Sequence, residues 1–273
     1  MKKILLFLFV AYFMVGCEKK TEWQLQTQDA NLIVVDGIIT NEQKVHIVTI
    51  NFPIAQLNEK PKPLSGATVL ISDADSTYTL SEQPLKSGKY ITSANFSGQV
   101  GKSYSLLINY NNKAYTAKTY MVKGYDFQPL EYVKNDNNKL YHLSWVASQY
   151  NALIPAMWEI LLDWSKADGY TNLNPDSCKA RLLFYTLPTL DVSEIFAPDV
   201  ENKSFPIGTI INQRRYSLNP EHAEFIRTLL LETTWQGGVF SSIPANVSTN
   251  LSKGAVGYFG ACEVNSSFQT VIP

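Results

Sequence analysis

Apolar and polar residues alternate in short runs between Asn31 and Val122, and turn residues separate the runs. Successive side chains of a β-strand point to opposite faces, so this alternation marks strands with one buried face. The runs KVHIVTINF and KSYSLLINY each gather their apolar residues on one face, namely Val48, Ile50 and Phe52 in the first and Tyr104, Leu106, Ile108 and Tyr110 in the second. Short strands at regular spacing predict a β-sandwich over residues 31–122.

Glycine and asparagine mark the expected turns. Gly66, Gly88 and Gly101 stand between runs, and Asn111-Asn112 separates KSYSLLINY from KAYTAKTY. Both residue types tolerate the positive φ angle that tight hairpin turns need. The sequence therefore predicts a β-hairpin centred on Asn111-Asn112.

The second half, residues 123–273, has the polar spacer KNDNNK (residues 134–139) near its start and continues the alternation. In MWEILLDW, one side of the predicted strand carries Trp158, Ile160, Leu162 and Trp164, and the other side carries Glu159 and Asp163. The run RLLFYTL follows as a further strand. This pattern predicts a second β-rich domain.

One helix is predicted within that second domain, over residues 220–234. Asn219 can cap it, Pro220 suits its first position, and an apolar stripe follows that consists of Phe225, Ile226, Leu229 and Leu230. We expect the stripe to pack on the sheet of its own domain. The predicted fold class is mainly β, with two β-sandwich-like domains, immunoglobulin-like or prealbumin-like, and one helix near the C-terminus.

The first 16 residues have the pattern of a signal peptide. Lys2 and Lys3 precede an apolar run from Ile4 to Val15, and charged residues follow soon after it. A run of this length suits a signal peptide and is shorter than the roughly 20 apolar residues that span a bilayer.

The leader ends in Met14-Val15-Gly16-Cys17, which resembles the lipobox of bacterial lipoproteins. The resemblance implies cleavage between Gly16 and Cys17 and attachment of acyl chains such as palmitate to Cys17. Several acyl chains anchor a protein stably, here through a linker over residues 17–30. An ordinary cleaved leader with a chance cysteine is the alternative. The charges after Cys17 are of both signs, which leaves open the membrane face on which the protein lies.

Charge and cysteine content narrow the picture further. The chain has 23 basic side chains, of which Lys2 and Lys3 lie in the leader, so 21 basic and 24 acidic side chains remain, a formal charge of −3. No basic stripe of a nucleic-acid-binding protein is present. Cys178 and Cys262 are an even pair that could form a disulfide in an oxidising compartment. Alternatively, Cys262 is a small buried hydrophobe, because it falls on the apolar side of a strand.

The first half also resembles the prealbumin-like, carboxypeptidase-regulatory type of sandwich. The matching phrases are Ser65-Gly66-Ala67, Gly88-Lys89-Tyr90 and the strand from Gly101 to Leu106. Domains of this type are scaffolds and interaction modules, so the resemblance implies that this half is not catalytic.

A wider pattern covers nearly the whole chain: the opening LIVVDGIITNE (residues 32–42), Val239-Phe240, Pro244-Ala245-Asn246-Val247, Asn250 and the closing GYFGA (residues 257–261). This pattern resembles the Bacteroidota lipoprotein family catalogued as domain of unknown function 4249. Members often sit beside TonB-dependent outer-membrane receptors. The resemblance therefore implies a protein of the outer membrane that assists uptake.

No chemical motif emerges from the remaining candidates. The three histidines, His46, His142 and His222, lie in separate predicted elements, and no nucleophile elbow, zinc-binding helix or phosphate-binding loop occurs. We therefore predict no catalytic residue, metal or cofactor. The five tryptophans could form a stacking platform for a sugar, but Trp158 and Trp164 share an apolar face, which favours core packing.

The segment Asp73-Ala74-Asp75-Ser76-Thr77 starts like a calcium loop, but Tyr78 and Pro84 occupy the positions that need glycine and glutamate. We expect a hairpin loop instead. Asp75-Ser76-Thr77 also resembles the O-glycosylation signal of the Bacteroidota, which implies Ser76 as a modified residue.

These observations favour a non-enzymatic outer-membrane lipoprotein that docks on or binds with a TonB-dependent transporter. The alternative is direct capture of a glycan or peptide by a surface lipoprotein, through exposed aromatic residues of the second domain. A hydrolase with an unrecognised site is the second alternative, and it would need paired carboxylates or a histidine–serine pair.

Overall fold

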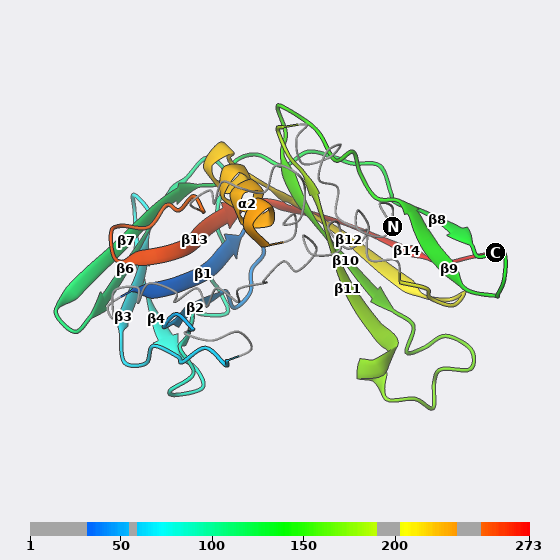
Figure 1. The fold of residues 1–273 in the computed structure, drawn as a ribbon, viewed down its shortest axis with the longest axis horizontal. Helices are drawn as coiled ribbons and strands as arrows, with labels where there is room; N and C mark the ends of the chain where they lie inside the picture. Colours follow the sequence, from blue (N-terminus) through cyan, green and yellow to red (C-terminus); the bar gives the residue numbers. More distant parts are fainter. Residues whose placement is uncertain (1–31, 55–58, 190–202, 234–246) are drawn as a thin grey trace, which may run out of the picture. The chain divides into compact units, whose positions relative to one another are not determined.

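The computed structural model describes residues 32–54, 59–189, 203–233 and 247–273. The predicted mainly-β fold is confirmed (Figure 1). The described residues contain an eight-stranded sheet of β1 (Ile33–Thr40), β2 (Ile47–Asn51), β3 (Thr68–Ser72), β4 (Thr77–Glu82), β5 (Lys89–Ile91), β6 (Ser103–Tyr110), β7 (Lys113–Tyr120) and β13 (Ala255–Cys262). They also contain a four-stranded sheet of β10 (Ala156–Asp163), β11 (Lys179–Thr186), β12 (Ile210–Ser217) and β14 (Val264–Thr270). A small sheet of β8 (Glu131–Lys134) and β9 (Tyr141–Trp145), a 3₁₀ turn η1 (Pro175–Cys178) and the helix α2 (Pro220–Thr233) complete the described elements.

The eight-stranded sheet curls until its two end strands, β7 and β13, lie side by side (Figure 1). Single bridges at Ala117–Leu251 and Val122–Cys262 link these two edges. The enclosed space is filled by apolar side chains, among them Val35, Ile50 and Leu106, each with no exposed surface. The sandwich predicted for residues 31–122 therefore buries one continuous core.

The side chain of Asn250 fastens this closure. Its Nδ2 donates hydrogen bonds to the carbonyl oxygens of Lys118 on β7 and Phe259 on β13, both at 2.8 Å. Its Oδ1 accepts from the backbone N–H of Phe259 at 3.1 Å. One asparagine thus satisfies backbone groups of both end strands, which gives a physical reason for an asparagine at this position of the family pattern.

Strand β13 comes from the second half of the chain but belongs to the first sheet. It pairs in parallel with β1 from Ile33–Ala255 to Thr40–Cys262. Contacts group residues 32–273 into one unit. The division into two domains at residue 122 stays a prediction. The two family-like segments, residues 32–42 and 257–261, meet in this pair of strands.

Local features of the first half follow the sequence closely. Val48, Ile50, Tyr104, Leu106 and Ile108 are buried as the alternation predicts, and Phe52 and Tyr110 are partly buried against the same core. The predicted hairpin is confirmed, because Asn111 and Asn112 have φ angles of 47° and 60° between β6 and β7. Two successive positive φ angles are typical of the hairpin turn that matches strand twist.

The second core lies against one face of the four-stranded sheet. Trp158, Ile160, Leu162 and Trp164 are buried there together, as predicted. Glu159 lies on the opposite side of the same strand, as predicted, and its exposed fraction is only 6%. Strand β10 is central in its sheet, between β11 and β12, so side chains of both neighbours surround the carboxylate.

Helix α2 begins and ends within one residue of the prediction, and it packs against strands of both large sheets. Its contacts are with β13 of the first sheet, and Ala223 and Ile226 pack in a cluster with Cys262 of that strand and Met157 and Tyr216 of the four-stranded sheet. Figure 1 shows the helix lying over β13.

Gly260 on β13 permits the close approach of the helix. A Cβ atom at this position would meet the ring of His222 at 2.6 Å. The helix therefore ties the two large sheets together instead of covering one of them. Within the described residues, no helix is long and apolar enough to cross a membrane.

Candidate functional site

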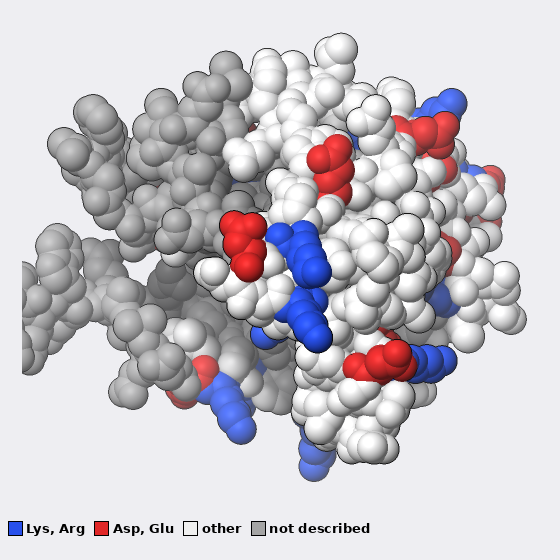
Figure 2. Space-filling model, turned by 90° about the vertical axis from the view of Figure 1, so that its right-hand side faces the viewer, with Lys and Arg blue, Asp and Glu red and all other residues white. Residues whose placement is uncertain are grey.

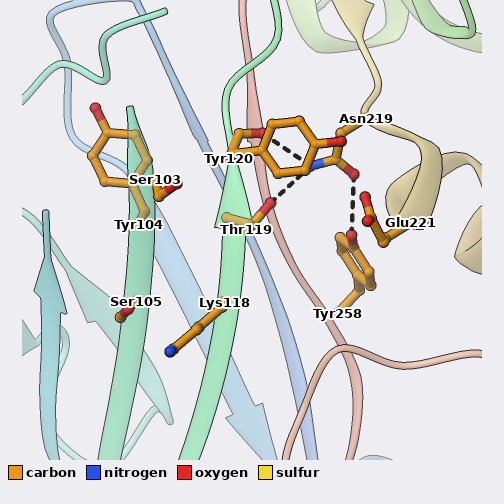
Figure 3. Close-up of a pocket in the computed structure, with 9 residues that line it drawn as sticks. All are labelled: Ser103, Tyr104, Ser105, Lys118, Thr119, Tyr120, Asn219, Glu221 and Tyr258. Carbon is orange, nitrogen blue, oxygen red and sulfur yellow. Dashed lines mark hydrogen bonds between the residues drawn. The ribbon is translucent and has the colours of Figure 1, made fainter. Parts of the chain in front are cut away.

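A cavity of about 260 Å³ opens where the β6–β7 hairpin meets β13 and the start of α2 (Figure 3). Strand register sets its first wall, because Ser103 pairs with Tyr120 and Ser105 pairs with Lys118. These four side chains therefore share the outer face of the hairpin. Glu221, in the first turn of α2, and Tyr258 of β13 form the opposite wall.

Asn219 organises the floor of this cavity (Figure 3). Its Oδ1 accepts hydrogen bonds from the backbone N–H of His222 at 2.8 Å, which caps the helix as predicted, and from the hydroxyl of Tyr258 at 3.4 Å. Its Nδ2 donates to Thr119 Oγ1 at 3.1 Å and to the Tyr120 carbonyl at 2.9 Å. The floor is thus rigid, and its polar groups are already occupied.

The rim of the cavity carries groups of opposite charge. The Lys118 ammonium forms no ion pair or side-chain hydrogen bond within the described part of the chain. Burial, the nearby negative charge of Glu221 and a hydrogen bond with that carboxylate raise the pKa of Tyr120. The Tyr120 side chain is nevertheless 37% exposed, so its ring can contact a bound molecule.

The groups that line this cavity are suited to binding a ligand. The cavity lining contains serine hydroxyls, the Lys118 ammonium and the Glu221 carboxylate. In the described ranges, no group of three or more histidine, cysteine, aspartate or glutamate residues could hold a metal ion. The lining can offer a ligand hydrogen bonds, charge pairing and ring contact.

A cysteine–histidine pair lies beneath the cavity, where sequence spacing gave no sign of it. Cys262 Sγ is 3.6 Å from His222 Nδ1, and the His222 ring stacks on Tyr258 with a centroid distance of 4.5 Å. Burial lowers the pKa of His222 to about 3 and raises the pKa of the Cys262 thiol to about 12. Both groups are therefore neutral, whereas a nucleophilic cysteine needs a thiolate. The pair packs α2 on β13.

A second group, of four charged residues and one tyrosine, joins the two large sheets. We call it the clasp, and it consists of Glu42, Glu159, Arg181, Arg214 and Tyr216. Arg214 Nη2 donates to both carboxylate oxygens of Glu42, at 2.8 and 2.6 Å, and Arg214 Nη1 donates to Glu159 at 2.6 Å. Arg181 Nε and the Tyr216 hydroxyl also donate to Glu159, at 2.5 and 2.8 Å. Glu42 lies in the turn between β1 and β2, so the clasp connects that turn to the four-stranded sheet.

The clasp does not supply the paired carboxylates of a hydrolase. Burial opposes ionisation of Glu42 and Glu159, but hydrogen bonds and the charges of Lys44, Arg181 and Arg214 outweigh it and lower both pKa values. Neither carboxyl group is held protonated as a general acid would be. Its geometry fits a structural role.

The remaining sequence candidates are scattered. His46 donates to or accepts from Thr40 Oγ1 at 2.9 Å, and burial is the main reason that its pKa falls to about 4. His142 lies 2.5 Å from Asn135 Oδ1 on the small sheet. Trp158 and Trp164 are core residues, with Trp158 Nε1 donating to Thr186, whereas Trp145 is 39% exposed. The structure brings none of these residues into the cavity.

Cys178 and Cys262 are both free and buried. Cys178 packs in the core on the four-stranded sheet with Trp158, whereas Cys262 packs in the cluster under α2. The structure therefore does not form the disulfide that their even number suggested. Cys262 matches the alternative of a small buried hydrophobe.

The Asp73–Thr77 segment forms the expected hairpin loop. Asp73 Oδ1 accepts from the backbone N–H groups of Asp75 and Ser76, both at 2.8 Å. Ser76 is exposed, and its glycosylation stays a prediction. Gly16, Cys17, Trp23, Trp235 and the family-like residues 239–246 lie outside the described residues.

The charged side chains of the visible surface are mixed in sign. Figure 2 shows lysines and arginines lying among aspartates and glutamates on one face, separated by uncharged residues. This distribution agrees with the small net charge of the chain. The face offers no extended single-sign field that would attract a polyanion.

Comparison with known families shows which family the chain belongs to. The family model described as Domain of unknown function (DUF4249) matches residues 18–267. No curated protein matches the sequence. The chain therefore belongs to the DUF4249 family.

Proposed function

We propose that this member of the DUF4249 family is a non-enzymatic lipoprotein of the outer membrane, anchored through Cys17, that docks as an accessory on a TonB-dependent transporter. The observation that carries the proposal is the Met14–Cys17 lipobox directly after an apolar leader of signal-peptide length. Acyl chains on Cys17 would hold the chain at a membrane and bring it to its partner.

The use of reactive groups supports a role without catalysis. The cysteine–histidine pair is neutral and buried, and the clasp carboxylates are engaged with arginines. Each group that could act as nucleophile, acid or base in these clusters thus serves the fold. A scaffold of this kind can present surface to a partner, and interfaces between separately folded proteins are about as polar as the rest of a surface.

The test is recovery of the partner from native cells. The tagged full chain is extracted in mild detergent and captured, and the co-purifying proteins are identified by mass spectrometry. We expect one outer-membrane barrel in near-equal amount. The Cys17→Ser variant is the control, because loss of the anchor should release the chain from the membrane fraction and reduce recovery of the barrel. Capture of the lipoprotein alone would count against docking.

A second candidate function is direct capture of a ligand, and the cavity beside α2 favours it. Its residues come from the hairpin, β13 and α2, not from exposed aromatic side chains of the second half. Ligand capture and docking are compatible, because an accessory protein can deliver what it binds. The two functions are tested separately.

A further inference from the structure

We propose that the cavity beside α2 binds a small zwitterion, a molecule with one ammonium group and one carboxylate, of the size of a short peptide. The inference rests on the second candidate function, ligand capture, and is independent of docking on a transporter. Three features carry it: the separation of opposite charges, the size of the cavity and the polar groups beside each charge.

The first feature is that the two charges are not paired with one another. Figure 3 shows Lys118 on the side of Ser105, whereas Glu221 lies across the cavity beside Tyr258. In the described part of the chain, no ion pair joins Lys118 to an acidic residue. A ligand with charges at both ends can satisfy the two groups at once.

The second feature is the set of polar groups at each end. Ser105 is the strand neighbour of Lys118, so its hydroxyl can donate to a carboxylate that the ammonium attracts. At the other end, the Glu221 carboxylate lies near enough to Tyr120 for its charge to raise the pKa of that hydroxyl, and its oxygen lone pairs can accept hydrogen bonds from a ligand ammonium. Hydrogen bonds between charged groups are roughly twice as strong as neutral ones.

The third feature is size. At about 260 Å³ the cavity lies below the range of about 300–1,000 Å³ that is usual for drug-sized ligands. The partly exposed ring of Tyr120 can cover an apolar side chain of such a molecule. A folded partner domain is too large, and a dipeptide is of suitable size.

An uncharged sugar is the competing ligand, and the geometry favours the zwitterion over it. A sugar could hydrogen bond to the serines and contact Tyr120, but it would leave both charges without a counter-charge. The zwitterion gains a charge-assisted hydrogen bond at each end. The contribution of the charges is therefore the quantity to measure.

The experiment titrates the full chain, purified in mild detergent, with glycyl-L-leucine and follows binding by calorimetry. N-acetyl-glycyl-L-leucine lacks the ammonium, glycyl-L-leucinamide lacks the carboxylate, and glucose is the uncharged probe. We expect the unmodified dipeptide to bind at least about tenfold more tightly than either blocked peptide, as expected for loss of one charge-assisted hydrogen bond.

Two variants test which residue contacts which charged end of the dipeptide. Lys118→Met should weaken binding of glycyl-L-leucine about tenfold and leave the affinity for the amide unchanged, because the amide has no carboxylate to lose. Glu221→Gln should weaken the dipeptide equally and leave the acetylated peptide unchanged. Lys113→Met, on the same strand but outside the cavity lining, and Glu131→Gln, on β8, are matched controls that should bind like the parent chain.

Three results would overturn the inference. Equal binding of the blocked and unblocked peptides would show that the charges do not matter. Binding of glucose in preference to the dipeptide would keep ligand capture but replace its ligand class. Absence of binding by every probe at millimolar concentration would reject the zwitterion site, while a barrel recovered in the capture experiment would still support docking.

Discussion

The clasp and the cavity each bring carboxylates and cations together, but they use them in different ways. In the clasp, Arg214 contacts two carboxylates at 2.6 to 2.8 Å and its side chain is 13% exposed. In the cavity, Lys118 and Glu221 are exposed and stand apart across an opening. The clasp joins the two large sheets, as do α2 with its apolar cluster and the hydrogen bonds between Asn41 and Val264.

This difference separates charges that stabilise from charges that can bind. Paired charges in a low dielectric hold elements in register, and removal of one partner leaves a buried charge uncompensated. Exposed charges remain hydrated and contribute little to folding, so they are free to exchange water for a ligand. Substitutions in the clasp should therefore change stability, whereas substitutions at the cavity rim should change binding.

Among the substitutions, the largest effect is expected for Arg214→Met. This substitution removes the contacts to Glu42 and Glu159 together, and Glu159 is 8% exposed at its side chain. We expect the free energy of unfolding to fall by about 3 kcal/mol, measured by urea denaturation at pH 7. Arg181→Met is the matched control, because that side chain is 59% exposed and should cost less than about 1 kcal/mol. Equal losses in the two variants would contradict the clasp as a buried contact.

Acidification should weaken the fold before it breaks the clasp. Burial lowers the pKa of His46 to about 4 and that of His222 to about 3, whereas the unfolded values are near 6.5. Below pH 6.5 the unfolded chain binds protons that the folded chain does not, so stability falls as the pH falls toward 4. The lowered pKa values of Glu42 and Glu159 keep their contribution intact above about pH 4.5.

We expect a loss of about 4 kcal/mol between pH 7 and pH 5, about 2 kcal/mol from each of the two histidines, measured by urea denaturation at each pH. His222→Gln should be less stable at every pH, because it loses the stacking on Tyr258, but its stability should depend less on pH in this window. Arg214→Met should keep the dependence of the parent chain. A parent chain that is equally stable at pH 7 and pH 5 would contradict the burial of neutral histidines.

Substitution of Asn219 in the floor of the cavity should lower the free energy of unfolding by an amount between the effects in the clasp and at the rim. Asn219→Ala removes the helix cap and both hydrogen bonds to β7, and we expect a loss of about 1 to 2 kcal/mol in urea denaturation. Asn219→Ser is the informative partner, because serine can still cap α2 but cannot reach β7 with two donors. If the two variants were equally unstable, the bonds to β7 would account for the whole effect and the cap for none of it.

The sequence predicts what is local in this structure. The strands, the Asn111-Asn112 hairpin and the start of α2 each follow from alternation or from one capping residue. The pairing of β1 with β13 could not be predicted by periodicity, because it joins segments more than 200 residues apart. Placement of β13 in the first sheet then decided where α2 would dock.

The contacts of the charged side chains could likewise not be predicted from local sequence. Alternation predicted Glu159 on a polar face, which is correct for its orientation, but the arginines that bury it come from the neighbouring strands β11 and β12. The cavity is assembled from four elements, and Lys118 and Glu221 carry no motif that would mark them in advance. Of the residues at this site, Asn219 had a sequence signal as a helix cap, Tyr104 as part of an alternating strand and Tyr258 as part of the family-like segment 257–261.

The smallest effect on stability is expected at the rim. Lys118→Met and Glu221→Gln alter exposed side chains, so each should change the free energy of unfolding by less than about 0.5 kcal/mol. Urea denaturation of the two variants beside the parent chain measures this, and the same samples serve for the dipeptide titration. If either variant lost as much free energy of unfolding as Arg214→Met, the rim charges would stabilise the fold as the clasp charges do. That result would contradict their assignment to ligand binding. Unchanged stability together with weakened dipeptide binding would assign these two charges to a ligand.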